Sequence, residues 1–122
     1  MNKKRFLIVD DSLAVIKRLT LILESFGHEV IGSAVNGIEA IAMTQELQPD
    51  AITMDIQMPE MDGLEATKRI LQDTPDKPVI IITAHGQEST VVDAIGAGAK
   101  YFICKPIERE KVGEVLRKVF SE

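Results

Sequence analysis

The chain has 122 residues, of which 45% are hydrophobic and 27% charged, and its net charge is −5. This length is typical of one domain with a hydrophobic core, and the composition is that of a folded globular protein. The negative charge argues against direct binding to the phosphate backbone of a nucleic acid.

Membrane insertion and secretion are not expected. No apolar run approaches the roughly 18 residues that a membrane-spanning helix needs. The apolar run after the basic N-terminus stops at Asp10, which is too short for a signal peptide. The single cysteine, Cys104, cannot form an internal disulfide, which fits a reducing compartment. We therefore expect a cytoplasmic protein whose residues 1–122 form a single domain.

Short apolar segments alternate with segments of helical spacing along the whole chain. The apolar segments are rich in β-branched residues and lie at 6–9, 30–34, 51–54, 79–83 and 101–104. Most are continuous hydrophobic runs, which indicates strands buried on both faces, as in a parallel sheet. The helical patterns lie at 12–26, 37–47, 62–71, 87–97 and 109–120. The alternation predicts an α/β domain with helices on both faces of a parallel sheet.

Chemically active side chains follow four of the five predicted strands. In an open α/β sheet, functional groups gather beyond the carboxyl ends of the strands. The residues at these ends are Asp10 and Asp11 after the first strand, Asp55 after the third, Thr83 and Ala84 at the fourth, and Lys105 and Pro106 after the fifth. We therefore expect three carboxylates, a hydroxyl and an ammonium to converge at one edge of the sheet.

This combination of groups suits phosphoryl transfer to a carboxylate. Neighbouring carboxylates raise one another's pKa values, and a hard divalent cation such as Mg²⁺ relieves the repulsion. A carboxylate can attack phosphorus and form an aspartyl phosphate. The charge on the phosphoryl oxygens then needs neutralisation, for which Lys105 supplies an ammonium and Thr83 a hydroxyl.

Each residue taken alone also has an ordinary structural explanation. An Asp after a strand is usually a helix N-cap or a turn residue, a Thr at a strand end is usually only a hydroxyl at the surface, and a Lys-Pro pair is uninformative. Ser12 is a better candidate than Asp11 for the N-cap of the first helix. Convergence of the whole set favours the functional interpretation.

The chain resembles the receiver domain of two-component response regulators over essentially its whole length, and most closely the stand-alone, chemotaxis-regulator-like members. The matching segments are Leu7-Ile8-Val9-Asp10-Asp11-Ser12, Met54-Asp55-Ile56-Gln57-Met58-Pro59, Met61-Asp62-Gly63, Ile82-Thr83-Ala84 and Lys105-Pro106. The resemblance, and not the sequence pattern, implies the flavodoxin-like (βα)5 fold, a three-layer sandwich with strand order 2-1-3-4-5.

The resemblance also implies a role for each site residue. Asp55 would be the phosphoacceptor, and Asp11 and Asp55 would bind Mg²⁺, or Mn²⁺ in its place, together with the backbone carbonyl of Gln57. Asp10 would act through a bound water. Lys105 would pair with the phosphoryl group, and its bond to Pro106 would be cis. As switch residues, Thr83 would move toward the phosphate and the aromatic Phe102 would rotate inward.

The same resemblance implies protein partners. The phosphodonor would be a phosphohistidine on a histidine kinase or a phosphotransfer protein, docking near Leu13 and Ala14 of the first helix and the loop at Ile107. The surface of the fourth helix, fifth strand and fifth helix would bind a downstream protein in chemotaxis or a phosphorelay. The domain would be a monomer or a phosphorylation-dependent dimer.

Three residues lie at positions that vary within the family. Phe102 replaces the tyrosine of the chemotaxis regulator and lacks its hydroxyl. Gln57 and His85 each lie two residues after a site residue, and we expect both to tune hydrolysis of the phosphoryl group. An exposed loop histidine is an equally ordinary explanation for His85.

Three other functions are compatible with an α/β domain of this kind. A hydrolase with a phosphoaspartate intermediate usually needs a substrate-binding cap and an Asp at the position of Gln57, and the sequence has neither. A flavodoxin-like cofactor binder needs a phosphate-binding loop where Asp10 and Asp11 would repel an anion. The chain could also be the receiver of a larger response regulator that is a transcription factor or an enzyme.

Two further expectations concern the burial of single residues. His28 is predicted to be an exposed turn residue, and Cys104 is predicted to be a small core residue.

Overall fold

The computed structural model describes residues 2–84 and 88–121. Its five-stranded parallel sheet has the order β2-β1-β3-β4-β5. The elements in chain order are β1 (Arg5–Val9), α1 (Leu13–Ser25), β2 (Glu29–Ala34), α2 (Gly37–Leu47), β3 (Ala51–Asp55), α3 (Gly63–Asp73), β4 (Val79–Thr83), α4 (Glu88–Gly96), β5 (Tyr101–Cys104) and α5 (Arg109–Val119). The predicted α/β class, the flavodoxin-like fold and the strand order are confirmed.

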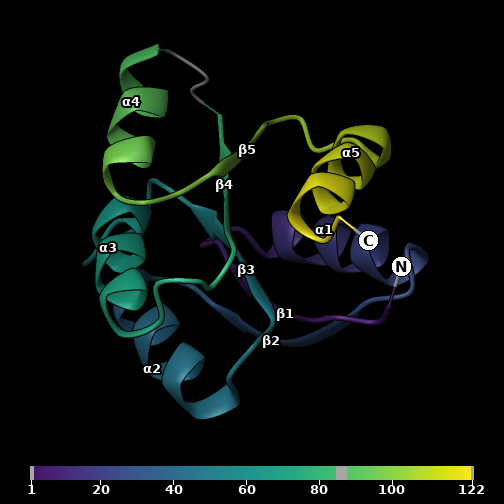
Figure 1. Ribbon diagram of the computed structural model, residues 1–122, viewed down its shortest axis with the longest axis horizontal. Coiled ribbons are helices and arrows are strands. Elements are labelled where there is room, and N and C mark those ends of the chain that lie inside the picture. The colour runs from purple at the N-terminus through teal and green to yellow at the C-terminus, as the bar shows by residue number, and fades with distance from the viewer. Residues whose placement is uncertain (1, 85–87, 122) are drawn as a thin grey trace.

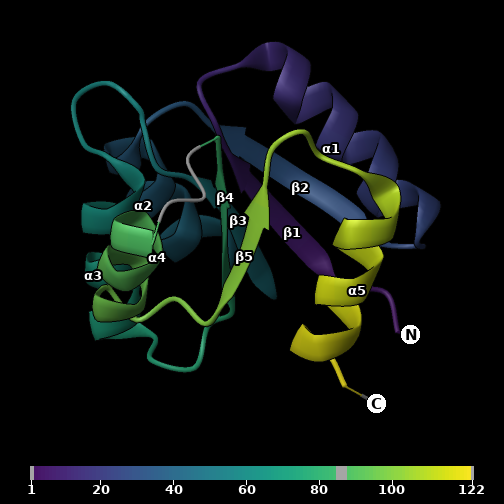
Figure 2. The same cartoon turned by 90° about the horizontal axis from the view of Figure 1, so that it is seen from above.

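The helices form layers on both faces of the sheet. Helices α1 and α5 cover one face, and α2, α3 and α4 cover the other (Figures 1 and 2). The two chain ends lie near each other on the side of α1 and α5 (Figure 1). This is the expected three-layer sandwich.

The continuous apolar runs of the strands supply both cores. In β1, Phe6 and Ile8 pack into the core under α1 and α5, whereas Leu7 and Val9 pack into the core under α2, α3 and α4. Successive side chains of a strand point to opposite faces, so a strand covered on both faces buries all its side chains and is mostly apolar. All five residues of β4 are buried for this reason.

Polar side chains fix the starts of three helices. Ser12 is the N-cap of α1, and its hydroxyl accepts a hydrogen bond from the N–H of Val15 at 3.4 Å. Asn36 and Asp62 cap α2 and α3 in the same way. Because Ser12 is the cap of α1, as predicted, Asp11 is not used for that purpose.

Two expectations about single residues are wrong. His28 is only 4% exposed, because its ring packs against the rings of Phe6 and Phe120 and its Nδ1 accepts the N–H of Lys4. Cys104 is exposed rather than buried, because it is the last residue of β5, which is an edge strand. Over the described part of the chain, no helix combines the length and hydrophobicity needed to cross a membrane.

Candidate functional site

Three carboxylates meet at the carboxyl edge of the sheet, at the ends of two neighbouring strands. Strands β1 and β3 pair in a register that sets Val9 beside Met54, so the residues that follow them come together. One carboxylate oxygen from each of Asp10, Asp11 and Asp55 lies within 4.8 Å of the others. Asp10 and Asp55 are buried, and Asp11 is exposed. The fold therefore brings together the three acidic residues that the sequence predicted.

Lys105, which directly follows β5, contacts two of these carboxylates. Its Nζ lies 3.3 Å from Oδ2 of Asp10 and 3.6 Å from Oδ1 of Asp55. The N–H of Lys105 donates to the carbonyl of Thr83 at 2.8 Å, and the Lys105–Pro106 peptide bond is cis, as expected. Among the described residues, the cluster contains three carboxylates and the ammonium of Lys105, so the site has an excess of negative charge.

This excess affects Asp55 most clearly. Burial and the negative charges of Asp10 and Asp11 raise its pKa from the usual 3.8 to about 6, although Lys105 and the N–H of Ile56 act in the opposite direction. Desolvation is the largest cause, because a buried carboxylate loses the water that stabilises its charge. The site therefore favours any group that brings positive charge to Asp55.

Asp10 is held rigidly within the cluster. Its N–H donates to the carbonyl of Ala34 at 3.0 Å, which continues the pairing of β1 and β2 by one residue. Its Oδ1 accepts the N–H of Ser12 at 2.9 Å, while its Oδ2 faces Lys105. Both carboxylate oxygens thus have a defined direction.

The other predicted site residues lie around the cluster. Thr83 is buried at the end of β4, one residue beyond Ile82, which pairs with Asp55. Gln57 is exposed in the segment after β3. Phe102 is half-buried in β5 and packs against the core under α2, α3 and α4. His85 lies outside the described residues.

Gly63 is a site residue whose role the sequence did not reveal. A Cβ at this position would lie 2.0 Å from the carbonyl oxygen of Asp55, so no side chain fits. The N–H of Gly63 also donates to the carbonyl of Ile56 at 2.8 Å. The only signal in the sequence was its place in the matching segment Met61-Asp62-Gly63, which did not indicate the contact.

The donor set suits a hard divalent cation. Carboxylate oxygens are the ligands that Mg²⁺ prefers, and here three converge, with the pKa of Asp55 raised by burial and by the charges of Asp10 and Asp11. Among residues 2–84 and 88–121, no Cys or His belongs to the cluster, so its described ligands are all oxygen atoms, which suit a hard cation better than a soft one. The cluster is therefore compatible with Mg²⁺ binding.

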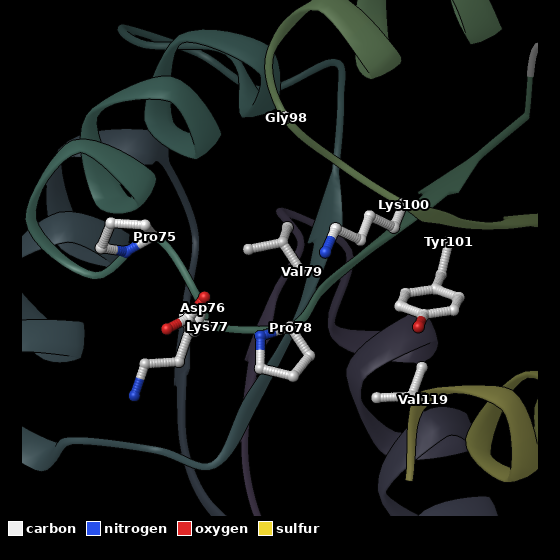
Figure 3. Close-up of a pocket in the computed structure, with 9 residues that line it drawn as sticks. All are labelled: Pro75, Asp76, Lys77, Pro78, Val79, Gly98, Lys100, Tyr101 and Val119. Carbon is white, nitrogen blue, oxygen red and sulfur yellow. The ribbon is translucent and has the colours of Figure 1, made fainter. Parts of the chain in front are cut away.

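A separate pocket lies at the other edge of the sheet. It has a volume of about 210 Å³ and includes Val79 and Tyr101, which begin β4 and β5 (Figure 3). Its charged lining residues are Asp76, Lys77 and Lys100, and the ammonium of Lys77 donates to the carbonyl of Pro49. None of the predicted site residues lines it, so the carboxylate cluster is the better candidate.

The chain is similar to known proteins over nearly its whole length. The sequence profile described as "Response regulator receiver domain" matches residues 6–117. The chemotaxis protein CheY of Thermotoga maritima is 47% identical over 116 residues, which cover 95% of this chain and 97% of that protein. CheY of Bacillus subtilis is 44% identical, with 96% of this chain and 98% of that protein covered.

A solved structure has the same fold over nearly the full chain. It is the CheX-CheY-BeF3-Mg+2 complex from Borrelia burgdorferi, matched with a TM-score of 0.92 and 39% identity over 97% of this chain and 90% of that chain. The profile match and these relatives, together with the carboxylate cluster at the predicted edge, show that the chain belongs to the response regulator receiver domain family.

Proposed function

We propose that this chain is a phosphorylation-dependent signalling switch in which Asp55 accepts a phosphoryl group from a phosphohistidine. The observation that supports this most directly is the position of Asp55, buried within the acidic cluster and 3.6 Å from the ammonium of Lys105. The raised pKa of Asp55, about 6, still leaves most of the carboxyl ionised near neutral pH, as a nucleophile requires.

The transfer forms one bond and breaks one. A carboxylate oxygen of Asp55 attacks phosphorus, the P–N bond to the donor imidazole breaks, and its electron pair stays on the imidazole nitrogen, which takes up a proton. Lys105 pairs with an oxygen of the incoming phosphoryl group, and the hydroxyl of Thr83 donates a hydrogen bond to another. The product is an aspartyl phosphate on Asp55.

A divalent cation is part of the proposal. The carboxylates of Asp11 and Asp55 and the backbone carbonyl of Gln57 would hold Mg²⁺, or Mn²⁺ in its place, and Asp10 would act through a bound water. When bound, the ion neutralises negative charge on the carboxylates and on the transferred phosphoryl group.

The aspartyl phosphate would change the surface formed by α4, β5 and α5. Thr83 and Phe102 are the proposed switch residues: Phe102 lies on β5, which belongs to this surface, and Thr83 ends β4, the strand that pairs with β5. Exposed apolar side chains on α4, Val92 at 60% and Ile95 at 58%, supply a surface that a downstream protein can bury. We propose that Gln57 and His85 tune how fast the phosphoryl group is lost.

The phosphodonor would be a histidine kinase or a phosphotransfer protein. It would dock near Leu13, which is 70% exposed, and Ala14, which is also exposed. Ile107 itself is only 3% exposed and cannot provide contact area, so its loop would contribute through neighbours such as Pro106 and Glu108, which are exposed.

We assign the switch to chemotaxis or a phosphorelay in the cytoplasm, because relatives at 43–47% identity are named chemotaxis protein CheY. The chain would catalyse only its own phosphorylation and dephosphorylation, act as a monomer or a phosphorylation-dependent dimer, and contain no effector domain within residues 1–122. Subcellular fractionation and light scattering with and without beryllofluoride test the location and the oligomeric state.

The phosphoacceptor can be tested with acetyl phosphate and Mg²⁺, followed by intact-mass spectrometry. The wild type should gain one phosphoryl group, and Asp55→Asn should gain none because its side chain is no longer a nucleophile. Asp76→Asn is the matched control, since Asp76 is an exposed carboxylate at the opposite edge of the sheet. Asp76→Asn should be labelled like the wild type. A chelator should stop the labelling of the wild type and of Asp76→Asn.

Stoichiometric labelling of Asp55→Asn would exclude Asp55 as the acceptor. Equal labelling with and without the chelator would remove the divalent cation from the proposal but leave the acceptor in place. The two parts of the proposed site are thereby tested separately.

A further inference from the structure

A side chain on α1 holds the loop that carries Lys105. The Nε of Arg18 donates a hydrogen bond to the carbonyl of Ile107 at 2.7 Å, across 89 positions of sequence. Ile107 lies two residues after Lys105 and one residue before Glu108, the N-cap of α5. Its carbonyl lies outside the hydrogen-bond ladder of α5, and Arg18 supplies the donor for it.

The loop around Lys105 is therefore attached at both ends. On one side, the N–H of Lys105 bonds to the carbonyl of Thr83. On the other side, the side chain of Ile107 is buried among the core residues under α1 and α5, and its carbonyl is bonded to Arg18. Only Pro106 separates the two points of attachment.

The position of this loop matters because Lys105 lies between two carboxylates. Its Nζ is 3.3 Å from Asp10 and 3.6 Å from Asp55, so a shift of a few tenths of an ångström changes which of them it approaches more closely. Asp10 is in turn fixed to the start of α1 through the N–H of Ser12. Arg18 thus links the loop of Lys105 to the helix that follows the acidic pair.

The packing of α1 against α5 does not depend on Arg18. Arg109 of α5 donates from its Nε to the hydroxyl of Ser25 at 2.9 Å, and its guanidinium lies 4.2 Å from the ring centroid of Phe26. Phe26 also covers Gly113, where a Cβ would approach its ring to 2.8 Å. These contacts lie at the far end of α1, so removal of Arg18 releases the loop and not the helix pair.

We infer that Arg18 is a positioning residue, which acts through the carbonyl of Ile107 to hold Lys105 where it can pair with a phosphoryl group on Asp55. This inference rests on the proposed function of Asp55. It adds a residue outside the cluster, on a helix that contributes no side chain to the cluster itself.

Two uncharged variants isolate the hydrogen bond. In Arg18→Gln the amide nitrogen occupies the place of Nε along the side chain and can still donate to Ile107. In Arg18→Met the side chain is as long as that of glutamine but has no hydrogen-bond donor. Both remove the positive charge, so any difference between them reports the hydrogen bond alone.

The first measurement is the initial rate of labelling by acetyl phosphate, which requires no docking partner. Arg18→Met should be slower than Arg18→Gln by about three- to tenfold, because misplacement of a charged group by a fraction of an ångström weakens its interaction with the transferred group. Lys17→Met is the charge control, since Lys17 precedes Arg18 on the exposed side of α1, and it should retain the wild-type rate. Equal rates for the Gln and Met variants would overturn the inference.

A second measurement separates positioning from a general loss of structure. In a Lys105→Ala background, the Gln and Met variants should label at equal rates, since the group that Arg18 positions is gone. A difference of the same size in both backgrounds would show that Arg18 supports the fold and does not act through Lys105.

Amide hydrogen exchange tests the loop without any phosphorylation. Peptides that cover residues 105–109 should exchange faster in Arg18→Met than in Arg18→Gln, and unchanged exchange would contradict the tether. A wild type that takes no label from acetyl phosphate refutes the proposed function, whereas equal exchange in the two variants refutes only the role of Arg18.

Discussion

The carbonyl oxygen of Asp55 lies 2.0 Å from the point that a Cβ on Gly63 would occupy. The same hypothetical atom would lie 2.9 Å from the carbonyl carbon of Asp55 and 2.9 Å from Cγ of Met54. Two of these neighbours belong to the backbone of a central strand and cannot rotate away. The start of α3 is therefore packed directly against the candidate phosphoacceptor, and this close approach requires glycine.

We predict that Gly63→Ala lowers the free energy of unfolding by roughly 3 kcal/mol, because either α3 or the end of β3 must move to admit the methyl group. Labelling of Asp55 by acetyl phosphate should also slow. Chemical denaturation and initial labelling rates check the two effects.

Gly96→Ala is the matched control for this substitution. A Cβ at Gly96 meets no described heavy atom within 4 Å, and Gly96 is the last residue of α4. The control should be neutral or more stable than the wild type by about 0.5–1 kcal/mol, because alanine favours helical backbone. Similar destabilisation by both variants would refute the close-packing explanation.

The raised pKa of Asp55 predicts that the metal-free protein loses stability as pH rises. The pKa is about 6 in the folded protein against the usual 3.8, so the folded state binds this proton more tightly than the unfolded chain does. The free energy of unfolding should fall as pH increases from about 4 to about 6, by an amount on the order of 3 kcal/mol. Urea denaturation in the presence of a chelator, repeated across this range, measures the effect.

Asp55→Asn removes the titrating group and should flatten this part of the pH profile. Near neutral pH the variant should be more stable than the metal-free wild type, since it has no buried charge beside Asp10. Added Mg²⁺ should stabilise the wild type and so reduce the difference in the free energy of unfolding between the two proteins. The free energy of unfolding of the wild type and of Asp55→Asn should therefore change differently between pH 4 and pH 6. An equal change in both proteins would contradict titration of Asp55 as the cause.

The sequence was sufficient to predict the acidic cluster but not the contacts that support it. The five residues Asp10, Asp11, Asp55, Thr83 and Lys105 lie at or just after the ends of apolar runs that indicate buried strands, and parallel strands bring their carboxyl ends to one edge. The bond from Arg18 to Ile107 joins residues 89 positions apart and depends on how α1 lies beside the loop after β5. No local pattern contains that information.

The two wrong expectations have the same origin. His28 follows a helix and a glycine, which is a typical place for an exposed turn residue, but Phe120 from the other end of the chain covers it. Cys104 belongs to an apolar run, but it is the last residue of the edge strand β5 and no neighbouring element that the structure describes covers it enough to bury it. Burial at such positions depends on long-range neighbours.

Thr53 is a buried residue whose side-chain hydroxyl forms no hydrogen bond with the described residues. It lies in the middle of β3, paired with Ile8 and Ile80, and is 2% exposed. Its hydroxyl has no hydrogen-bond partner in the part of the chain that the structure describes. Replacement by valine keeps the shape and removes the unpaired hydroxyl. Thr53→Val should therefore raise the free energy of unfolding by about 1–2 kcal/mol.

Thr67→Val should change the free energy of unfolding in the opposite direction to Thr53→Val, although both threonines are buried. Thr67 is 0% exposed, and its hydroxyl donates to the carbonyl of Gly63 at 2.7 Å. Loss of this bond should lower the free energy of unfolding by about 1 kcal/mol. Denaturation curves of the two variants should shift in opposite directions, and a shift of both in the same direction would show that hydrogen bonding does not explain the difference.

The buried ring of His28 joins the two ends of the chain. Its centroid lies 5.3 Å from that of Phe6 and 6.2 Å from that of Phe120, and its Nδ1 accepts the N–H of Lys4 at 3.0 Å. We predict that His28→Ala lowers the free energy of unfolding by about 3 kcal/mol, through the loss of ring contacts and of the acceptor. His28→Phe keeps a ring but removes the acceptor, so it should cost only about 1 kcal/mol.

These two variants also separate stability from signalling. His28 packs at the strand ends opposite the carboxylate cluster, since it directly precedes Glu29, the first residue of β2, and accepts the N–H of Lys4, which directly precedes Arg5, the first residue of β1. Labelling of Asp55 by acetyl phosphate should remain at the wild-type rate in both variants under conditions in which they are folded. A slower rate in folded His28→Phe would mean that the packing of the chain ends influences the phosphorylation site across the length of the sheet.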